Sequence, residues 1–125
     1  SEPGYMFRAA CSQNMSAVTA ACLMTKAGVY EEVNGLTEIF DVAFNDIDYC
    51  LKVRQAGYLV VFNPHAECYH YESKSRGLED TGEKVARFNS EIEKFEKAWP
   101  EILKEGDPYY NINLSVMNGW YQLRE

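Results

Sequence analysis

The stretch NDIDYCLKVRQAGYLVVFNP, residues 45–64, carries the two signals that decide the fold class. In its first half, Ile47, Cys50 and Leu51 have the i, i+3, i+4 spacing of one helix face, and Gly57 is a common helix terminator. Its second half, YLVVF, is a continuous apolar run closed by an Asn-Pro turn, which is typical of a buried strand. An amphipathic helix followed directly by a buried strand predicts an α/β protein.

Further elements are expected on both sides of this stretch. Before it, the apolar run AVTAACLM (residues 17–24) predicts another buried strand, and KAGVYEEV (residues 26–33) predicts a short helix ended by Asn-Gly. After it, residues 67–71 favour a third, short strand. A long helix is then expected after Asp80, which has capping-box spacing to Glu83, because apolar residues recur at steps of three and four. These residues are Val85, Phe88, Ile92, Phe95 and Trp99.

The long helix is expected to break at Pro100, where a second, short helix begins. The tail GDPYYNINLSV combines turn formers with aromatic residues, so it is expected to be ordered without being regular. The apolar runs AVTAACLM and YLVVF read as central strands of a larger sheet than this chain supplies. We therefore expect the chain to be part of a larger α/β domain and to fold poorly or self-associate when expressed alone.

The composition excludes several classes of protein. Of the 125 residues, 46% are apolar and 14% aromatic, so the chain can build a core and disorder is not expected. A net charge of −7 argues against nucleic acid as a partner, because such binding needs a basic face. The four cysteines match no CxxC metal motif, and they are expected to be buried free thiols in a reducing compartment.

Asp46 and Asp48 form the first candidate site, in the first turn of the helix that Asn45 is expected to cap. One interpretation is structural, because acidic side chains there complement the positive end of the helix dipole. The other is functional: one carboxylate faces a cleft and acts as a general base. Residues two apart do not share a helix face, so the two aspartates need not have the same role.

The second candidate site follows in ECYHYESKSRG, residues 67–77. His70 is a potential metal ligand or base, although a histidine between tyrosines is commonly a packed residue. Hydroxyls and cations suited to phosphate come directly after it. They are carried by Ser73, Lys74, Ser75 and Arg76.

The two segments together carry a more specific signal. The run SAVTAACLMTKAGVYEEVNGLTEIFDVAFNDIDYCLKVRQAGYLVVFNPHAECYHYESKSRG resembles the C-terminal, acceptor-binding half of a bacterial glycosyltransferase family 2 domain of the rhamnosyltransferase-like kind. The later GDPYYNINLS is similar to the segment that closes such domains. The resemblance extends from about Ser16 to Leu114.

This resemblance implies a GT-A fold, with residues 1–125 as the C-terminal part of the catalytic domain. The family's nucleotide-binding half and its DxD motif have no counterpart in this chain. The implied reaction is the inverting transfer of a sugar, hexosyl or rhamnosyl, from a nucleotide-diphosphate donor to a hydroxyl of a glycan or lipid-linked acceptor, in surface polysaccharide synthesis. Donor binding would then need the missing N-terminal half of the same domain.

The resemblance also implies roles for single residues. Asp46 takes the position of the catalytic base, and Asp48 matches a second aspartate that shapes the acceptor site. His70 would complete the coordination of a divalent metal, Mg²⁺ or Mn²⁺. The loop with Ser73, Lys74, Ser75 and Arg76 would bind the donor diphosphate. The location implied is the cytoplasm, including the inner face of the cell membrane.

Two other functions stay open at this point. The chain could be a sugar- or nucleotide-binding module without chemistry. It could also be a structural fragment in which the aspartates only complement a helix dipole and the loop is solvated.

Overall fold

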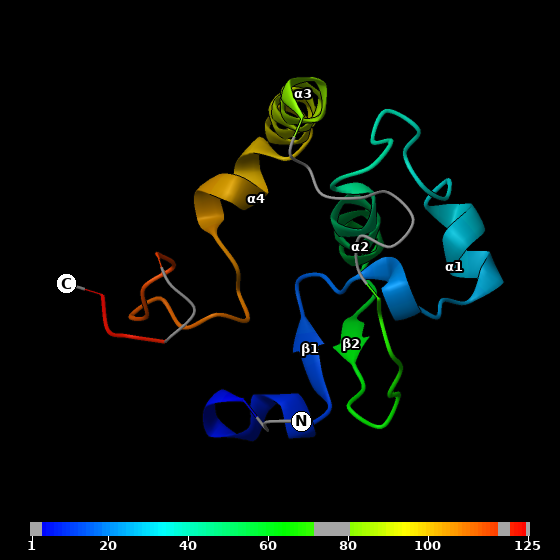
Figure 1. The fold of residues 1–125 in the computed structure, drawn as a ribbon. Coiled ribbons are helices and arrows are strands. Elements are labelled where there is room, and N and C mark those ends of the chain that lie inside the picture. The colour runs from blue at the N-terminus through cyan, green and yellow to red at the C-terminus, as the bar shows by residue number, and fades with distance from the viewer. Residues whose placement is uncertain (1–3, 72–80, 118–120, 125) are drawn as a thin grey trace.

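The computed structural model describes residues 4–71, 81–117 and 121–124 of the chain. It shows a small protein of mixed helices and strands, compatible with the predicted α/β class (Figure 1). The α-helices are α1 (Ala27–Glu32), α2 (Asn45–Gln55), α3 (Gly82–Ala98) and α4 (Pro100–Glu105). The other elements are two 3₁₀ segments, η1 (Tyr5–Ala10) and η2 (Ala20–Cys22), and two strands, β1 (Gln13–Met15) and β2 (Val60–Phe62).

The sheet of the described residues consists of β1 and β2 alone, paired antiparallel with Asn14 opposite Val61. The prediction of a strand over residues 17–24 is therefore wrong, since the partner of β2 comes from the preceding polar segment. The physical reason lies in the backbone donors of that run. The amide of Ala21 donates to the side chain of Thr19, and the amide of Ala20 donates to the carboxylate of Asp46 on α2. These residues therefore form the 3₁₀ segment η2 and no strand. Residues 67–71 likewise form no strand.

The helix predictions are confirmed. α1 ends at Glu32, just before Asn34 and Gly35, which both have the positive φ that such a stop requires, 58° and 60°. α2 covers the predicted stretch and is followed by Gly57 at φ 91°. Pro100 separates α3 from α4 as expected. At its start, however, α2 is preceded by Phe44 as the N-cap residue, one position before the predicted Asn45.

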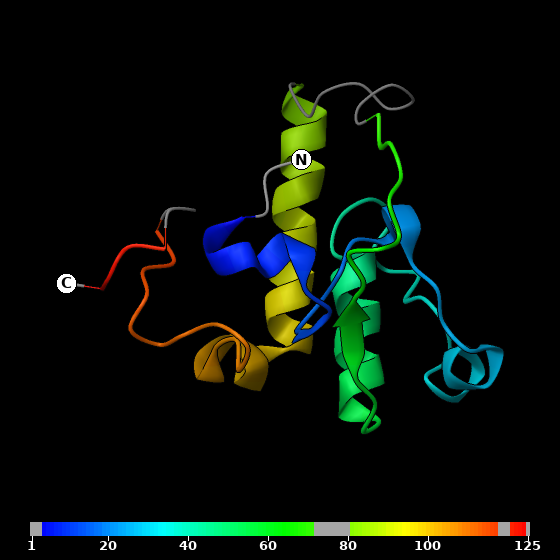
Figure 2. The same cartoon turned by 90° about the horizontal axis from the view of Figure 1, so that it is seen from below.

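The core consists of two clusters that share α2. Buried residues of the first cluster are Val33, Tyr49, Cys50, Val53 and Val60. Those of the second are Phe40, Leu51, Phe95 and Trp99. One face of α2 thus packs on α1 and β2 and another on the C-terminal part of α3, and Figure 2 shows α2 and α3 side by side. The helix α2, which carries both candidate aspartates, is therefore the element that joins the two clusters.

Much apolar surface stays accessible to solvent. The chain exposes 9863 Å², whereas a compact monomer of 14.3 kDa is expected to expose about 6,800 Å². Large exposed side chains occur in β2 and next to it, where Leu59 is 62% and Val61 52% exposed. The fold therefore leaves one of its two strands incompletely covered.

Candidate functional site

The start of α2 is fixed by an unusual backbone at Phe44, whose φ of 65° is in the left-handed region. Such a conformation is rare for a bulky residue and persists only where packing holds it. Here the ring stacks on Phe88 and Phe95 of α3, with centroid distances of 5.6 Å and 5.0 Å. The Phe44 carbonyl accepts the amide of Asp48 at 2.8 Å. Packing on α3 therefore sets the direction in which the first turn of α2 leaves the loop.

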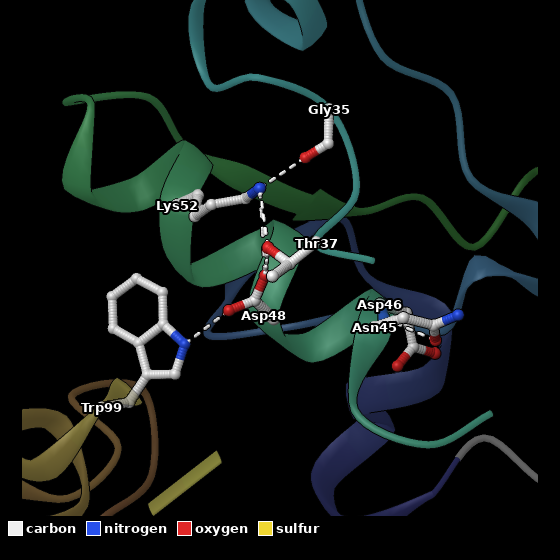
Figure 3. Close-up of polar contacts among 7 residues, drawn as sticks. All are labelled: Gly35, Thr37, Asn45, Asp46, Asp48, Lys52 and Trp99. Carbon is white, nitrogen blue, oxygen red and sulfur yellow. Dashed lines mark hydrogen bonds and ion pairs between the residues drawn. The ribbon is translucent and has the colours of Figure 1, made fainter. Parts of the chain in front are cut away.

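Asp46 lies in this first turn and is partly exposed. Its Oδ2 accepts the amide of Ala20 at 3.2 Å, and its Oδ1 accepts the amide of Ile47 at 2.9 Å. The Asp46 amide is in turn bonded by the Asn45 side chain at 2.9 Å (Figure 3). Two backbone donors thus orient a carboxylate that solvent still reaches, at the positive end of a helix.

Asp48 is only 3% exposed and is surrounded by donors. The indole Nε1 of Trp99 donates to its Oδ1 at 2.7 Å, and the hydroxyl of Thr37 donates to its Oδ2 at 2.5 Å. The ammonium of Lys52 lies 3.9 Å from Oδ2 and donates to Thr37 Oγ1 and to the carbonyl of Gly35. A buried carboxylate is tolerated only with such partners. Asp48 therefore joins the loop after α1, the helix α2 and the end of α3.

The two aspartates point to different surroundings, as the helix spacing predicts (Figure 3). Asp46 points toward η2 and solvent, and Asp48 points into the core. Of the two, Asp46 has the exposure that contact with a substrate requires. The contacts of Asp48 suit a residue that shapes the site from within, and its direct contact with an acceptor stays a prediction.

Glu91 is a further carboxylate of this region, and the sequence reasoning missed it. It is 2% exposed, and its oxygens accept the amides of Val42 at 3.0 Å and Ala43 at 3.3 Å. Glu91 thereby connects α3 to the loop that precedes Phe44. A signal was present, since residue 91 falls on the apolar stripe of α3, three residues after Phe88, where a charge needs a partner.

The segment with His70 approaches the same end of α2. Interaction with the thiol of Cys22, the last residue of η2, raises the pKa of Cys68. The amide of Ala20, also in η2, is the one that meets Asp46. In both ribbon views the chain after β2 runs beside this turn (Figures 1 and 2). His70 is exposed.

Other parts of the predicted donor site are not described. Ser73, Lys74, Ser75 and Arg76 lie outside the described residues. Across residues 4–71, 81–117 and 121–124, no three side chains of His, Cys, Asp or Glu come together as a metal site would require. Metal binding by His70 stays a prediction.

The cysteine prediction is partly wrong. All four are free thiols, but Cys50 alone is buried, while Cys11, Cys22 and Cys68 are exposed. Apolar neighbours in the sequence suggested burial. The reason for the exposure of Cys22 is that its run turns into a surface 3₁₀ segment and forms no core strand.

A cavity of about 900 Å³ lies apart from the aspartates, between the end of α4 and the tail. Tyr110, Tyr121 and Arg124 are among its lining residues. Among the predicted site residues that the structure describes, Asp46, Asp48 and His70, none lines this cavity.

The chain is similar in sequence to several known proteins. It is 52% identical over 114 residues to the uncharacterized protein y4gI of Sinorhizobium fredii, and 30% identical over 105 residues to the O-antigen biosynthesis protein RfbC of Myxococcus xanthus. It is 26% identical over 73 residues to the N-acetylglucosaminyl-diphospho-decaprenol L-rhamnosyltransferase of Mycobacterium tuberculosis. The latter two support a glycosyltransferase-like relationship.

The matches cover most of this chain but little of the relatives. They include 90%, 84% and 58% of the chain, and 12%, 8% and 24% of the respective relatives. The chain thus spans about a quarter or less of each relative's length. No protein-family model matches the chain, and no solved structure does. Within the described residues, no helix has the length and apolar character to cross a membrane.

Proposed function

We propose that this chain forms the acceptor-side part of an inverting glycosyltransferase, with Asp46 as the catalytic base. The observation that carries the proposal is the contrast between the two aspartates of α2. Asp46 is accessible and oriented by two backbone donors, while Asp48 is buried with both oxygens bonded. The similarity to an O-antigen biosynthesis protein and to a rhamnosyltransferase supports glycosyl transfer as the chemistry.

The proposed reaction is a single displacement. Asp46 accepts the proton of the acceptor hydroxyl while that oxygen attacks the anomeric carbon of the donor sugar, and the nucleotide diphosphate leaves from the opposite face. The backbone amides of Ala20 and Ile47 keep the carboxylate oriented, so that little reorganisation is needed when the acceptor arrives. Inversion of the anomeric configuration follows from this geometry.

Asp48 is proposed to act by positioning. Its bonds to Thr37 and Trp99 fix the turn after α1 and the end of α3 against α2. Movement of any of these elements would shift the first turn of α2, on which Asp46 lies. In the full-length enzyme the same frame would form one wall of the acceptor site.

The donor side is proposed to involve the segment after β2. A bound Mg²⁺ or Mn²⁺ would stabilise the charge that develops on the leaving diphosphate, with His70 as one ligand and further ligands from a nucleotide-binding half of a GT-A fold outside this chain. Ser73, Lys74, Ser75 and Arg76 would bind the diphosphate oxygens. The product would enter a surface polysaccharide made at the cytoplasmic face of the membrane.

Replacement of the base tests this proposal. In the full-length protein, incubated with a panel of nucleotide sugars, Asp46→Asn is expected to lower kcat for transfer or donor hydrolysis by at least about 10², the scale of general-base loss. Donor affinity should change little. Asp41→Asn provides a matched control, because Asp41 is an exposed acid in the loop just before α2.

Near-normal turnover by Asp46→Asn would refute the assignment of the base. Donor binding without turnover by the unmodified protein on every donor tested would favour a non-catalytic binding module instead. Equal losses in the Asp41 and Asp46 variants would point to a general charge effect.

A calorimetric titration tests the donor side. Nucleotide diphosphate is titrated into full-length His70→Ala, Lys74→Ala and Arg76→Ala variants with and without Mn²⁺. His70→Ala should weaken the Mn²⁺-dependent part of binding, and each lysine or arginine variant should lose affinity by about 1.5–3 kcal/mol, the value of a charge-assisted hydrogen bond. Unchanged binding in all three variants would show that this stretch is a surface loop.

A further inference from the structure

The closing segment GDPYY, residues 106–110, forms a turn that is fixed by Asp107. The amide of Tyr109 donates to Asp107 Oδ1 at 2.8 Å, and the amide of Tyr110 donates to the Asp107 carbonyl at 3.2 Å. The same Oδ1 accepts the hydroxyl of Ser16, which directly follows β1, at 2.5 Å. Asp107 thus joins the closing segment to a part of the chain that lies 91 positions earlier.

The segment that begins at Ser16 lies along one face of α2. On this helix Asp46, Cys50 and Arg54 recur at steps of four, so they share that face. The amide of Ala20 donates to Asp46 Oδ2 at 3.2 Å. One turn further along α2, the thiol of Cys50 donates to a carbonyl of the same segment at 3.7 Å. The segment therefore covers the first two positions of the face.

The closing segment covers the third position. The guanidinium of Arg54 lies 5.5 Å from the centroid of the Tyr109 ring. Within the described part of the chain, Nη1 of Arg54 is buried without a hydrogen-bond partner. Contact with the ring therefore offsets part of the cost of burying this cation. The two segments are thus neighbours on α2, and the bond between Ser16 and Asp107 joins them.

We propose that Asp107 is a positioning residue for Asp46. Its bond to Ser16 holds residues 16–20 against α2 and thereby keeps the Ala20 amide in place. Of the two backbone donors to the Asp46 carboxylate, this amide is the one that does not belong to α2 itself. Without the Ser16 bond the segment would leave α2 more often, and the carboxylate would lose that donor. The inference rests on the proposed function, because Asp107 has a part in catalysis only if Asp46 is the base.

Cys50 makes the position of this segment observable without a substrate. Its side chain is 1% exposed, and Ala17 and Val18 pack on the core cluster to which it belongs. Displacement of residues 16–20 should therefore expose the thiol to N-ethylmaleimide. The tryptic peptide of residues 27–52 contains no other cysteine, so mass spectrometry of this peptide reports alkylation at Cys50 alone.

Four variants of the full-length protein are compared. Ser16→Ala removes the donor and keeps the turn bond between Asp107 and Tyr109, whereas Asp107→Ala removes both bonds. Asp107→Asn is the conservative variant, because its amide oxygen can still accept from the Ser16 hydroxyl. Glu105→Ala is the matched control, since Glu105 is an exposed acid at the end of α4, two residues before Asp107.

In Ser16→Ala and Asp107→Ala, alkylation of Cys50 should be about tenfold faster, the effect of one hydrogen bond on a local opening equilibrium. In both, kcat should fall by about tenfold, as a displaced catalytic group predicts, while KM for the donor changes little. Asp107→Asn and Glu105→Ala should behave like the unmodified protein. The double variant of Ser16 and Asp107 should lose no more than Asp107→Ala, because both changes remove the same bond.

Unchanged alkylation of Cys50 in both Ser16→Ala and Asp107→Ala would overturn the proposal, and so would faster alkylation at normal kcat. A loss of helix content in Ser16→Ala, measured by circular dichroism, would also count against it, because the change would then be unfolding. Asp46→Asn is measured beside these variants to separate a failure of the proposed function. If Asp46→Asn keeps normal turnover, the base is wrong and Asp107 positions no base, whatever the alkylation of Cys50.

Discussion

Asp48 is held by donors from three separate parts of the chain. The indole of Trp99 comes from the junction of α3 and α4, the hydroxyl of Thr37 from the loop after α1, and the ammonium of Lys52 from the next turn of α2. An unpaired carboxylate at this depth would cost several kcal/mol, so these partners and the carboxylate depend on one another. A single side chain therefore couples both core clusters.

Removal of this carboxylate should destabilise the protein strongly. Asp48→Ala leaves the buried indole N–H of Trp99 and the hydroxyl of Thr37 without their acceptor, and we expect a loss of about 2–4 kcal/mol in the free energy of unfolding. Urea denaturation followed by circular dichroism measures it. Asp48→Asn should cost less, because its amide oxygen can still accept from Trp99.

Asp46→Ala is the matched comparison for this prediction. Asp46 is partly exposed and its bonds are to backbone amides at a helix start, so its loss should cost about 1 kcal/mol. If Asp46→Ala were as destabilising as Asp48→Ala, the division between an accessible base and a structural carboxylate would be wrong.

At the scale of elements, α3 determines where α2 begins. The carboxylate of Glu91 binds the amides of Val42 and Ala43, and the rings of Phe88 and Phe95 hold Phe44 in its left-handed conformation. Among the described residues, no other helix or strand accepts hydrogen bonds from the backbone amides of this loop. The orientation of Asp46 therefore depends on a helix that is more than forty residues away in the sequence.

Loss of the Glu91 carboxylate should release this loop. For Glu91→Ala we expect faster hydrogen exchange at the amides of Val42 and Ala43, and a loss of about 1.5–3 kcal/mol in stability, the value of hydrogen bonds to a charged group. Glu93→Ala, at an exposed position of the same helix, should change stability by less than about 0.5 kcal/mol. Unchanged protection of both amides in Glu91→Ala would mean that other contacts hold the loop.

The helices could be predicted from the sequence because their signals are local. The spacing of Cys50 and Leu51, the stops at Gly35 and Gly57, and the restart at Pro100 each depend on a few neighbouring residues. The caps of α2 and α3 were each misplaced by one residue, since α2 is preceded by Phe44, which packs on distant α3, and α3 by Thr81. No local pattern encodes that contact.

The strands and part of the site could not be predicted in this way. The pairing of β1 with β2 joins residues nearly fifty positions apart, and the polar segment Gln13–Met15 gives no apolar signal. The apolar run of residues 17–24 wrongly predicted a strand, because the side chains of Thr19 and Asp46 accept hydrogen bonds from its backbone amides. The different surroundings of the two aspartates followed correctly from helix geometry, whereas the bonds from Glu91 to the loop before α2 needed the tertiary structure.

At the scale of the whole molecule, the described fold is incompletely covered. Its accessible surface of 9863 Å² exceeds by nearly half the value of about 6,800 Å² expected for a compact chain of this mass. Both strands have three residues, and the sheet of the described residues contains no others, so each strand has an outer edge without a strand partner. Exposed apolar side chains next to unpaired strand edges favour association with another chain.

The isolated 125-residue chain is therefore expected to self-associate or to unfold without cooperativity. Sedimentation velocity at increasing protein concentration should show a rising weight-average mass, and the thermal transition should be broad. Val61→Lys, on the exposed face of β2, should reduce association without loss of helix content. A monomer with a sharp, concentration-independent melt would contradict this prediction.

The hydrogen bond between Trp99 and Asp48 also makes the molecule observable. The chain has two tryptophans, so Trp120→Phe leaves Trp99 as the single indole fluorophore. Its ring is 9% exposed and its Nε1 donates to a carboxylate, so its emission should lie at short wavelength and shift to the red when water reaches it. Fluorescence of this one residue can thus follow the junction of α2, α3 and α4 in real time, during folding or while candidate ligands are added.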